Sequence, residues 1–501
     1  MNPLLIRTEV TPKTGAGHFM RCLALAQGWL GQGGRIVFVV SEESTIPFPE
    51  KISTDIEIIR ILHVAGSVSD AEQTALLAKK VGTSWIVLDG YGFDSDFQKN
   101  IKQSGINLLV IDDYAHADFY HADVVLNQNL YAQPELYEGK YDTVRLLVGP
   151  RYALLRQEFR KWRTWKREIP QTVTKILVIM GGSDQKNATL TVLKALRCIG
   201  NPGLEIRVVT GFNNPRLGEL TEESRKSPAA IRFIDGSRDM SELIAWADIG
   251  ISAAGSTSWE LASLGLPSLL ISVSENQIPV ARVLQEQHVS LDLGVFESIS
   301  VGKIEENLLE LMQSKELREE LSRNGRRLID GQGVERTIMV MTGVALRLQQ
   351  ITEDDCMRVY AWVTDPDVRR NSFSAKDITL VDHKRWFRER LSDPSCVYNI
   401  IINRDDLPVG QVRFDITECD AVISILIAKE YRGKNIGQQA IKLASESLFR
   451  IRPVNNIHAY VKAENIPSLN AFKKSGFRLS EEIVKNKQRA HHLVMSRLGK
   501  P

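Results

Sequence analysis

The sequence predicts a chain of mixed α/β and α+β class, in which two successive α/β domains with parallel sheets precede an α+β domain. Three observations support this prediction. The 501 residues correspond to about three domains at roughly 150 residues each. Up to about residue 345, apolar strand-like runs alternate with helical segments, as expected of parallel sheets covered by helices. Beyond that point, successive strands are joined by short turns, as in an antiparallel sheet.

Composition and charge exclude several classes of protein. Lys and Arg number 63 against 61 Asp and Glu, a formal net charge of +2, so there is no cationic surplus for a nucleic acid partner. Hydrophobic residues make up 43% and charged residues 25%, which are globular values, so the whole chain is expected to fold. The apolar run at residues 3–6 is too short for a signal peptide, and no later run approaches a membrane span. We therefore expect a cytoplasmic protein without a membrane partner.

Four apolar runs predict strands of the first α/β domain, at residues 36–40, 56–62, 85–88 and 108–111. The second run is interrupted by Glu57 and Arg60, which places it nearer the sheet edge. The pattern restarts at residue 175 and continues through runs at 205–209, 231–234, 249–252 and 268–273. The two domains are therefore expected at residues 1–168 and 169–345, with a ligand cleft between them.

The third domain is expected at residues 346–501. Its strand-like runs at 398–402, 409–416 and 422–427 are separated by short turns, which indicates an antiparallel meander rather than βαβ units. A helix from about residue 436 to 449 follows, so this domain is α+β.

A glycine-rich segment follows the N-terminal strand. Gly15, Gly17 and His18 precede a helix, and glycines there let backbone N–H groups approach an anionic ligand at the helix start. An imidazole beside such a ligand can move a proton. Taken alone, the segment is equally compatible with a tight turn and a helix-capping histidine.

Two segments of small residues follow strands of the second domain. Gly181, Gly182 and Ser183 lie in a strand-to-helix turn that either holds a phosphate or serves only as a turn. Residues 252–260 are more informative, because their hydroxyls suit a diphosphate at a helix start. Glu260 lies one turn inside that helix, where a carboxylate can accept both hydroxyls of a ribose. The alternative, a solvated helix carboxylate, agrees less well with its apolar neighbours.

These segments belong to a longer ordered set, which comprises Gly15-Ala16-Gly17-His18 with Arg21, Asp89-Gly90-Tyr91, Asp112-Asp113, Asn127-Gln128-Asn129, residues 149–159, Gly181-Gly182-Ser183-Asp184, residues 252–260 and Glu275-Asn276-Gln277. Together, over residues 1–345, they resemble the UDP-2,4-diacetamido-2,4,6-trideoxy-β-L-altropyranose hydrolases of pseudaminic acid biosynthesis. That family resembles glycosyltransferases with two Rossmann-like domains, the glycosyltransferase-B-like arrangement. The resemblance implies that water replaces the sugar acceptor, the anomeric C–O bond is cleaved and UDP is released.

The resemblance also implies roles for individual residues. His18 would be the base that activates or orients water, and Tyr91 and Asn276 would line the sugar site as further catalytic residues. The substrate and UDP would be held by Gly17, Arg21, Gly181, Ser183, Gly255, Ser256, Thr257 and Glu260. The chain departs from the family at Glu9, where an aspartate is usual, and at Ala16, where threonine is common. The first departure puts one substrate contact in doubt.

No metal is expected for this reaction. Two helix N-termini and backbone donors can stabilise the charge on a UDP leaving group. Asp94 and Asp96 have the spacing of a metal-binding pair, but they follow an apparent loop and are interpreted as a helix cap. The five cysteines are scattered and show no metal-ligand spacing, so they predict neither zinc nor disulfides.

The third domain carries two further segments. Residues 427–440 join a strand to a long helix and offer an arginine and successive N–H groups as a pyrophosphate cradle, with a basic capped turn as the alternative. Together with residues 463–477, this segment resembles the acetyl-CoA site of the GNAT acetyltransferase superfamily, over residues 347–497. The resemblance implies that acetyl-CoA is bound by Ile427, Arg432, Gly433, Lys434, Asn435, Ile436, Gly437 and Asn470.

Two positions differ from many GNAT sequences. Asn435 stands at the first glycine of the cradle, where asparagine is tolerated because it readily enters left-handed backbone conformations. Phe472 stands where many members have a tyrosine that can protonate the departing thiolate. The general acid of this domain is therefore left unassigned.

The fusion of these domains suggests a two-step function. The hydrolase substrate carries a C4 acetamido group, which a GNAT-type enzyme installs on the UDP-linked 4-amino sugar one step earlier. We therefore expect the third domain to N-acetylate the substrate that the first two domains hydrolyse. The expected ligands are a UDP-sugar and acetyl-CoA, and other enzymes of the sugar pathway are candidate partners. Two alternatives stay open, a protein or small-amine N-acetyltransferase fused to a nucleotide-sugar-sensing module, and a true glycosyltransferase.

Overall fold

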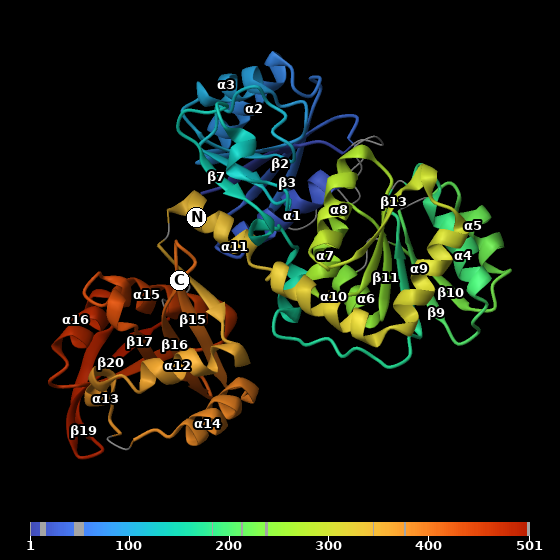
Figure 1. Cartoon of the computed structure of the whole chain (residues 1–501). Helices are drawn as coiled ribbons and strands as arrows, with labels where there is room; N and C mark the ends of the chain where they lie inside the picture. Colours follow the sequence, from blue (N-terminus) through green and yellow to red (C-terminus); the bar gives the residue numbers. More distant parts are fainter. Residues whose placement is uncertain are drawn as a thin grey trace. The chain divides into compact units, whose positions relative to one another are not determined.

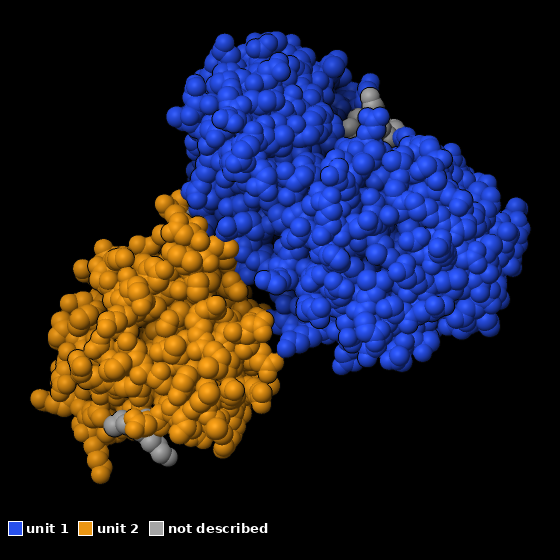
Figure 2. All heavy atoms as spheres, viewed as in Figure 1, with its two compact units in different colours: residues 1–341 blue, residues 342–501 orange. Residues whose placement is uncertain are grey.

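The computed structural model describes residues 2–10, 17–44, 55–182, 184–211, 214–235, 239–343, 345–374 and 377–497. The chain forms two compact units, unit 1 (residues 1–341) and unit 2 (residues 342–501), which are coloured separately in Figure 2. Among the described residues, no helix is long and apolar enough to cross a membrane.

Unit 1 begins with a seven-stranded sheet in the order β3-β2-β1-β4-β5-β6-β7, in which every pairing is parallel. Strands β2, β3 and β7 of this sheet are labelled in Figure 1. Its strands are β1 (Leu4–Thr8), β2 (Ile36–Ser41), β3 (Ile56–Ile61), β4 (Trp85–Asp89), β5 (Asn107–Ile111), β6 (Val124–Asn127) and β7 (Arg145–Val148). As predicted from its interrupted apolar run, β3 lies at the sheet edge. The order reverses between β1 and β4, and such a switch point is where ligands bind in open parallel sheets.

Helices cover both faces of this first sheet. Its helices are α1 (Gly17–Leu30), α2 (Val68–Val81) and α3 (Ser95–Lys102), with short 3-10 helices η1 (Pro134–Tyr137), η2 (Pro150–Tyr152) and η3 (Gln157–Trp162) in the later connections. Apolar side chains of α1 pack on one face and those of α2 and α3 on the other. The sheet is thus buried on both sides, which leaves its carboxyl edge as the place where polar side chains gather.

A second parallel sheet follows, with six strands in the order β10-β9-β8-β11-β12-β13. Its strands are β8 (Lys175–Ile179), β9 (Glu205–Thr210), β10 (Ala230–Asp235), β11 (Ile249–Ala253), β12 (Ser268–Ser272) and β13 (Leu291–Val295). Its helices are α4 (Ala188–Ile199), α5 (Leu217–Ser224), α6 (Met240–Trp246), α7 (Thr257–Ser263), η4 (Glu275–Gln277), α8 (Ile278–Glu286), η5 (Phe296–Ser298), α9 (Val301–Gln313) and α10 (Lys315–Leu328). Helices α4 and α9 pack on one face, and α6, α7 and α8 on the other.

The last helix of unit 1, α11 (Gly333–Thr342), returns to the first sheet. Val334 and Ile338 on α11 join the apolar core around α1. The close approach depends on Gly28, because a Cβ at that position would lie 2.3 Å from Val334 Cγ1. This crossing ties the end of the second half of unit 1 to its first helix, the helix that carries His18 at its start.

Unit 2 contains a single seven-stranded sheet in the order β14-β15-β16-β17-β18-β20-β19. Its strands are β14 (Leu346–Gln350), β15 (Cys396–Asn403), β16 (Pro408–Thr417), β17 (Asp420–Ile427), β18 (Asn456–Lys462), β19 (Arg478–Lys485) and β20 (Gln488–Ser496). All neighbouring strands are antiparallel except β17 and β18, which are parallel. That one pair is hydrogen-bonded only from Asp420 to Val422, so the two strands separate beyond His458.

The helices of unit 2 lie on both faces of its sheet. They are η6 (Glu353–Asp355), α12 (Cys356–Val363), α13 (Pro366–Asn371), α14 (Leu380–Ser392), η7 (Lys429–Tyr431), α15 (Ile436–Ile451) and α16 (Ile466–Lys474). The long helices α15 and α16 pack on one face over Phe414 and Ile457, whereas α12 and α14 pack against β15 around Phe387 and Ile400. Two parallel α/β sheets followed by a sheet that is antiparallel except for one pair confirm the predicted fold class.

Candidate active sites

Polar side chains gather at the carboxyl ends of the central strands in the first sheet of unit 1. Asp89 ends β4, Asp113 follows β5, and His18 and Arg21 lie on the first turns of α1. Because the strands are parallel, the residues that follow them meet at one edge of the sheet. These four residues, with Tyr91, form what we call the switch-point cluster.

Arg21 is the centre of the switch-point cluster. Its Nε and Nη2 donate to the two carboxylate oxygens of Asp89, each at 2.7 Å, and its Nη1 donates to Asp113 Oδ1 at 2.7 Å. Arg21 and Asp89 are buried, and Asp113 is only 14% exposed. Burial alone would raise the pKa of Asp113, but the guanidinium outweighs it and holds that pKa well below its ordinary value; the pKa of Asp89 is lowered for the same reason. Both carboxylates are therefore ionised at neutral pH.

His18 is oriented by Asp89. The distance from His18 Nδ1 to Asp89 Oδ1 is 2.5 Å, and the ring is 8% exposed. A neutral imidazole that donates from Nδ1 to a carboxylate keeps the lone pair on Nε2. In this tautomer the ring can accept a proton at Nε2. Arg21 Nη2 also lies 3.1 Å from Nδ1, so the same nitrogen faces both members of the Arg21–Asp89 pair.

Tyr91 lies beside His18 and remains a phenol. The two rings meet edge to face with centroids 4.9 Å apart, and the hydroxyl of Tyr91 donates to Asp113 Oδ2 at 2.8 Å. Burial and the charge of Asp113 raise the pKa of Tyr91 well above its ordinary value. The side chain of Asn276, in η4 of the second half of unit 1, is near enough to lower this pKa in the opposite direction. The three residues expected to be catalytic thus lie together.

The residues of the second half that were expected to bind UDP lie close to the start of α1. An ideal Cβ on Gly17 would lie 3.6 Å from Ser256 Oγ, so the start of α1 approaches the residue before α7. Thr257 is the first residue of α7, and Gly255 lies against the Gln277 side chain, where a Cβ would be 3.6 Å from Nε2. Two helix starts therefore converge, each with backbone N–H groups that can bind an anion.

Glu260 is paired with an arginine. Arg156 donates to Glu260 Oε1 from Nη2 at 3.0 Å and from Nε at 3.3 Å, and it also pairs with Glu158 at 2.9 Å. The side chain of Glu260 is 15% exposed. The alternative of a solvated helix carboxylate is therefore wrong. Both of the hydrogen bonds from Arg156 are made to Oε1 of Glu260.

The glycine turn after β8 is tightly held. Gly181 has a φ of +85°, and a Cβ on Gly211 would lie 1.8 Å from the Gly182 carbonyl oxygen. Asp184 accepts from the backbone N–H groups of Ala188 and Thr189 at 2.8 and 3.1 Å, so its own carboxylate caps the start of α4. Ser183, which was also expected to bind substrate, lies outside the described residues.

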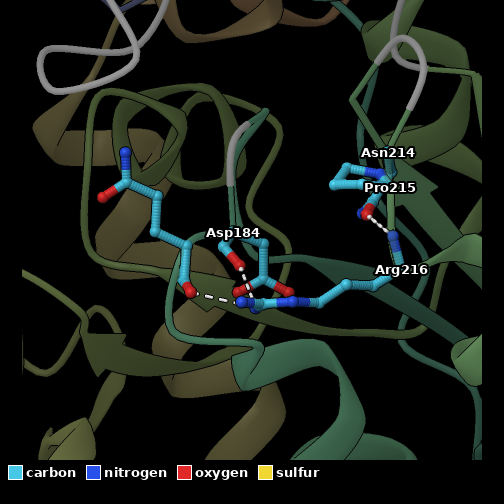
Figure 3. Close-up of a pocket in the computed structure, with 5 residues that line it drawn as sticks. Asp184, Asn214, Pro215 and Arg216 are labelled. Atoms are coloured by element: carbon cyan, nitrogen blue, oxygen red, sulfur yellow. Dashed lines mark hydrogen bonds between the residues drawn. The ribbon is translucent and has the colours of Figure 1, made fainter.

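A hollow of about 270 Å³ opens beside this turn, lined by Asp184, Gln185, Asn214, Pro215 and Arg216 (Figure 3). The Arg216 guanidinium donates to the carbonyl oxygens of Asp184 and Gln185 at 3.3 and 2.9 Å. The hollow lies beyond the carboxyl ends of β8 and β9. The hollow is therefore polar. Its cationic side chain, Arg216, already donates hydrogen bonds to backbone carbonyl oxygens of the protein.

In unit 2, the expected acetyl-CoA segment connects β17 to α15. Gly433 and Asn435 both have left-handed backbone conformations, with φ of +77° and +59°, and the helix starts at Ile436.

The side chain of Arg432 is held on three sides. It donates from Nε to the carbonyl oxygen of Ile427 at 2.9 Å. Its other nitrogens pair with Asp365 and Asp367 at 3.3 and 3.4 Å. A Cβ on Gly437 would contact Ile427 at 3.7 Å, and Lys434 lies over the Tyr431 ring.

Asn435 offers a test of this turn. Replacing Asn435 by valine should destabilise unit 2 by about 1–2 kcal/mol, because a side chain branched at Cβ is costly in the left-handed region. Asn435→Gly should not be destabilising, since glycine enters that region freely. Chemical denaturation of the full chain measures both changes, and equal stability of the two variants would contradict the proposed reason.

The second expected acetyl-CoA segment lies on α16. Asn470 is exposed, whereas Asn465 accepts from the Ser468 backbone N–H at 3.2 Å and caps the helix. Phe472 is buried in the core, with its ring edge-on to Phe477 at 5.0 Å. The phenyl ring of Phe472 therefore contributes to core packing. It has no hydroxyl that could protonate the departing thiolate.

Sequence reasoning noticed some contributors without giving them a role. Asp89 and Asp113 lie in two of the sequence motifs, but only the structure shows that Arg21 is their shared partner and that Arg156 pairs with Glu260. Their position directly after parallel strands was the available signal for the aspartates. Arg156 gave no such signal.

Comparisons with protein families match two parts of the chain. Residues 176–332 match the glycosyltransferase family 28 C-terminal domain, and residues 345–478 match the acetyltransferase (GNAT) domain. A solved structure of MurG from Acinetobacter baumannii is similar over 69% of this chain and 100% of its own length, with a TM-score of 0.51 and 16% identity. This similarity shows the glycosyltransferase-B-like fold.

Two curated relatives extend the comparison. An uncharacterized protein of Methanocaldococcus jannaschii is 24% identical over 96% of this chain and 97% of its own length. A Campylobacter jejuni protein named UDP-2,4-diacetamido-2,4,6-trideoxy-beta-L-altropyranose hydrolase is 29% identical over 46% of this chain and 78% of its own length. The chain therefore joins a glycosyltransferase-B-like pair of domains, homologous to proteins named as hydrolases of the pseudaminic acid pathway, to a GNAT acetyltransferase domain.

Proposed function

We propose that the chain is a bifunctional enzyme of nucleotide-sugar metabolism. Unit 1 would hydrolyse UDP-2,4-diacetamido-2,4,6-trideoxy-β-L-altropyranose to UDP and the free sugar. Unit 2 would first transfer the acetyl group of acetyl-CoA to the 4-amino group of the UDP-linked precursor. The observation that carries the first part is the convergence of His18, Tyr91 and Asn276 from three separate elements of unit 1.

In the proposed hydrolysis, water attacks the anomeric carbon while His18 Nε2 takes its proton. Asp89 holds His18 Nδ1–H and stabilises the imidazolium that forms, as the carboxylate does in other carboxylate–histidine pairs. The C–O bond to the β-phosphate breaks, and its electron pair leaves with UDP. Tyr91, whose O–H is donated to Asp113, would accept a hydrogen bond from a sugar hydroxyl through its phenol oxygen.

The nucleotide would lie between the two helix starts. Backbone N–H groups near Gly17, Gly255 and Thr257 would bind the diphosphate, and Ser256 and Glu260 would bind by their side chains. The developing negative charge on UDP is then stabilised by fixed dipoles, so the proposal assigns this role to the protein backbone and not to a metal. Gly181 and Ser183 remain proposed contacts of the same ligand.

Glu260 gives a specific test of nucleotide binding. Glu260→Gln should raise KM for the UDP-sugar by about tenfold to a hundredfold, the effect of losing one hydrogen bond to a charged acceptor. The unmodified chain should discriminate against a 2′-deoxyuridine analogue of the substrate, and the variant should discriminate much less. Steady-state kinetics with both substrates checks this. Undiminished discrimination in the variant would remove Glu260 from the ribose site.

For unit 2, the proposed cosubstrate is acetyl-CoA, with its pyrophosphate at the start of α15. Arg432, Gly433, Lys434, Asn435, Ile436 and Gly437 would form this cradle, with Ile427 and Asn470 contacting other parts of the cosubstrate. Arg432 is held in place by the Ile427 carbonyl and Asp365, which supports a preformed site. The amine would attack the thioester carbon, and the C–S bond would break with release of CoA.

One experiment tests the two-step proposal directly. The purified chain is incubated with the UDP-4-amino sugar and acetyl-CoA, and products are followed by NMR. We expect N-acetylation first and UDP release second, with no UDP released before the acetyl group is present. Hydrolysis of a supplied diacetamido substrate without any acetylation would contradict the unit 2 assignment. UDP release only when a sugar acceptor is added would favour a glycosyltransferase instead.

A further inference from the structure

A continuous line of hydrogen-bonded side chains crosses the sheet of unit 2. Asp420 Oδ2 lies 3.1 Å from His458 Nε2, His458 Nδ1 lies 3.0 Å from His492 Nε2, and His492 Nδ1 lies 3.2 Å from Glu481 Oε1. The four residues come from β17, β18, β20 and β19. We call this line the histidine relay.

The number of protons that the histidine relay needs is unusual. Each of its three hydrogen bonds requires one proton on an imidazole nitrogen, so the two rings must carry three protons between them. Two neutral imidazoles carry only two, and two imidazolium rings carry four, which would place two N–H groups face to face across 3.0 Å. All three hydrogen bonds can therefore form only when the two rings together carry three protons, which is one more than two neutral imidazoles carry.

Charged and aromatic side chains surround the histidine relay. Hydrogen bonds from His458 and Asn456 lower the pKa of Asp420, so its carboxylate is ionised. Tyr460 stacks on His492 at 4.9 Å, and Lys485 Nζ lies 3.6 Å from the centre of the Tyr460 ring. Glu482 lies 3.8 Å from the neighbouring His491, outside the relay. The relay thus ends on a carboxylate at each side, Asp420 and Glu481.

The histidine relay begins where β17 and β18 separate. His458 is the last residue of β18 that pairs with β17. The alternate residues Ile457, Ala459 and Val461 face the core under α15 and α16, so His458 and Tyr460 lie on the opposite face of the sheet. A thioester that entered between the separated strands from the α15 side would meet an amine arriving on the side of His458.

The histidine relay is also open enough to exchange protons. The side chains of His458 and His492 are 21% and 14% exposed, so each is shielded but reachable. Glu481, at the far end, is 62% exposed and can pass a proton to water. The relay thus connects the point where the strands separate with solvent.

We propose that His458 and His492 together accept the proton of the acceptor ammonium group during acetyl transfer, a role that rests on the proposed acetyltransferase function of unit 2. Before transfer the two rings hold two protons between them, and His458 Nε2 is unprotonated. The primary ammonium gives one proton to that nitrogen and becomes a neutral amine, and the pair then holds the three protons of the complete relay. The amine forms the new C–N bond to the acetyl carbon, the C–S bond breaks, and the amine nitrogen passes its surplus proton to the departing CoA thiolate. The relay returns its proton to water through Glu481.

The first arm of the test needs no activity. NMR of the full chain labelled with [13C]-histidine follows the protonation of both rings from pH 5 to 9, with His458→Gln and His492→Gln for assignment. We expect the pair to take up one shared proton, with the second entering only at much lower pH, and either substitution to abolish this coupling. Two rings that titrate independently, one proton each, would overturn the inference.

The second arm measures acetyl transfer from acetyl-CoA to the UDP-4-amino sugar against pH. His458→Gln and His492→Gln should be slower by roughly 10²–10⁴-fold near neutral pH, the usual contribution of a general base. The deficit should shrink by about tenfold per pH unit as the amine loses its own proton, and added imidazole should restore part of the rate. His491→Gln is the matched control and should behave as the unmodified chain.

The outcomes separate this inference from the proposed function. No acetylation by the unmodified chain, with a coupled titration of the two rings, would refute the assigned amine and leave the relay supported. Normal acetylation with a variant deficit that stays constant at every pH would refute the relay and leave the acetyltransferase function intact. Unchanged CoA affinity in each variant, measured by calorimetry, shows that unit 2 is folded.

Discussion

Replacing His18 by alanine should lower the turnover number for UDP release by roughly 10²–10⁴-fold, the range that a positioned general base contributes. The imidazole is the group whose Nε2 is available as an acceptor in the switch-point cluster, since its Nδ1 is bound to Asp89. Arg21 and both aspartates are committed to one another and cannot take a proton without breaking buried ion pairs. The effect should therefore fall on kcat more than on KM.

Asp89→Asn separates orientation from charge in the same reaction. An amide of the same shape can donate to His18 Nδ1, which favours the tautomer with a proton on Nε2 and removes the base. Initial rates of UDP release from the diacetamido sugar measure both variants. Acetyl transfer by unit 2 should be unchanged, and His288→Ala, at a side chain that is 67% exposed, should hydrolyse normally. Full activity in His18→Ala would exclude His18 as the base.

The fold could be predicted from sequence because its signals are local. Continuous apolar runs such as Ile36–Ser41 mark strands buried on both faces, and the meander after residue 345 has short turns that a parallel sheet cannot use. Interruption of Ile56–Ile61 by charged residues was enough to place that strand at the edge. Each of these inferences needs only the residues of one segment and its neighbours.

The contacts within the candidate sites were harder to predict because they join distant parts of the chain. Arg21 and Asp113 are 92 positions apart, and Arg156 and Glu260 are 104 apart. A motif shows that a charged residue follows a strand, but the choice of partner depends on strand order and helix placement, which only the folded chain determines. The pairing of His458 with His492 likewise depends on the register between β18 and β20.

Phe472 shows the opposite case, in which the sequence raised a question that packing answers. The missing hydroxyl was evident from the motif, and the structure places the ring in the core against Phe477. A tyrosine there would need a partner for its hydroxyl or a path to the thiolate. The observed packing explains why phenylalanine is acceptable for stability, and it moves the search for proton-transfer groups to the other face of the sheet.

Arg21→Met should destabilise unit 1 by about 3–5 kcal/mol, the cost of leaving buried carboxylates without their partner. Asp89 is fully buried and Asp113 nearly so, and both lose hydrogen bonds to the same guanidinium. Differential scanning calorimetry of the full chain should show the transition of unit 1 at lower temperature and that of unit 2 unchanged. Arg21→Lys keeps the charge but not the forked geometry of the guanidinium. The stability of unit 1 in this variant should therefore lie between that of the unmodified chain and that of Arg21→Met.

The pH dependence of this deficit identifies its cause. In the unmodified chain the lowered pKa values of Asp89 and Asp113 mean that their contribution to stability is present above the ordinary carboxyl pKa and is lost as pH falls through the lowered values. Without Arg21, burial raises both pKa values, so the variant takes up protons at a higher pH than the unmodified chain. The stability difference should therefore be largest at neutral pH and shrink towards pH 4, and Asp113→Asn added to Arg21→Met should recover part of it. A deficit that does not change with pH would mean that Arg21 stabilises unit 1 by packing alone, and that the carboxylates of the switch-point cluster are not held ionised by it.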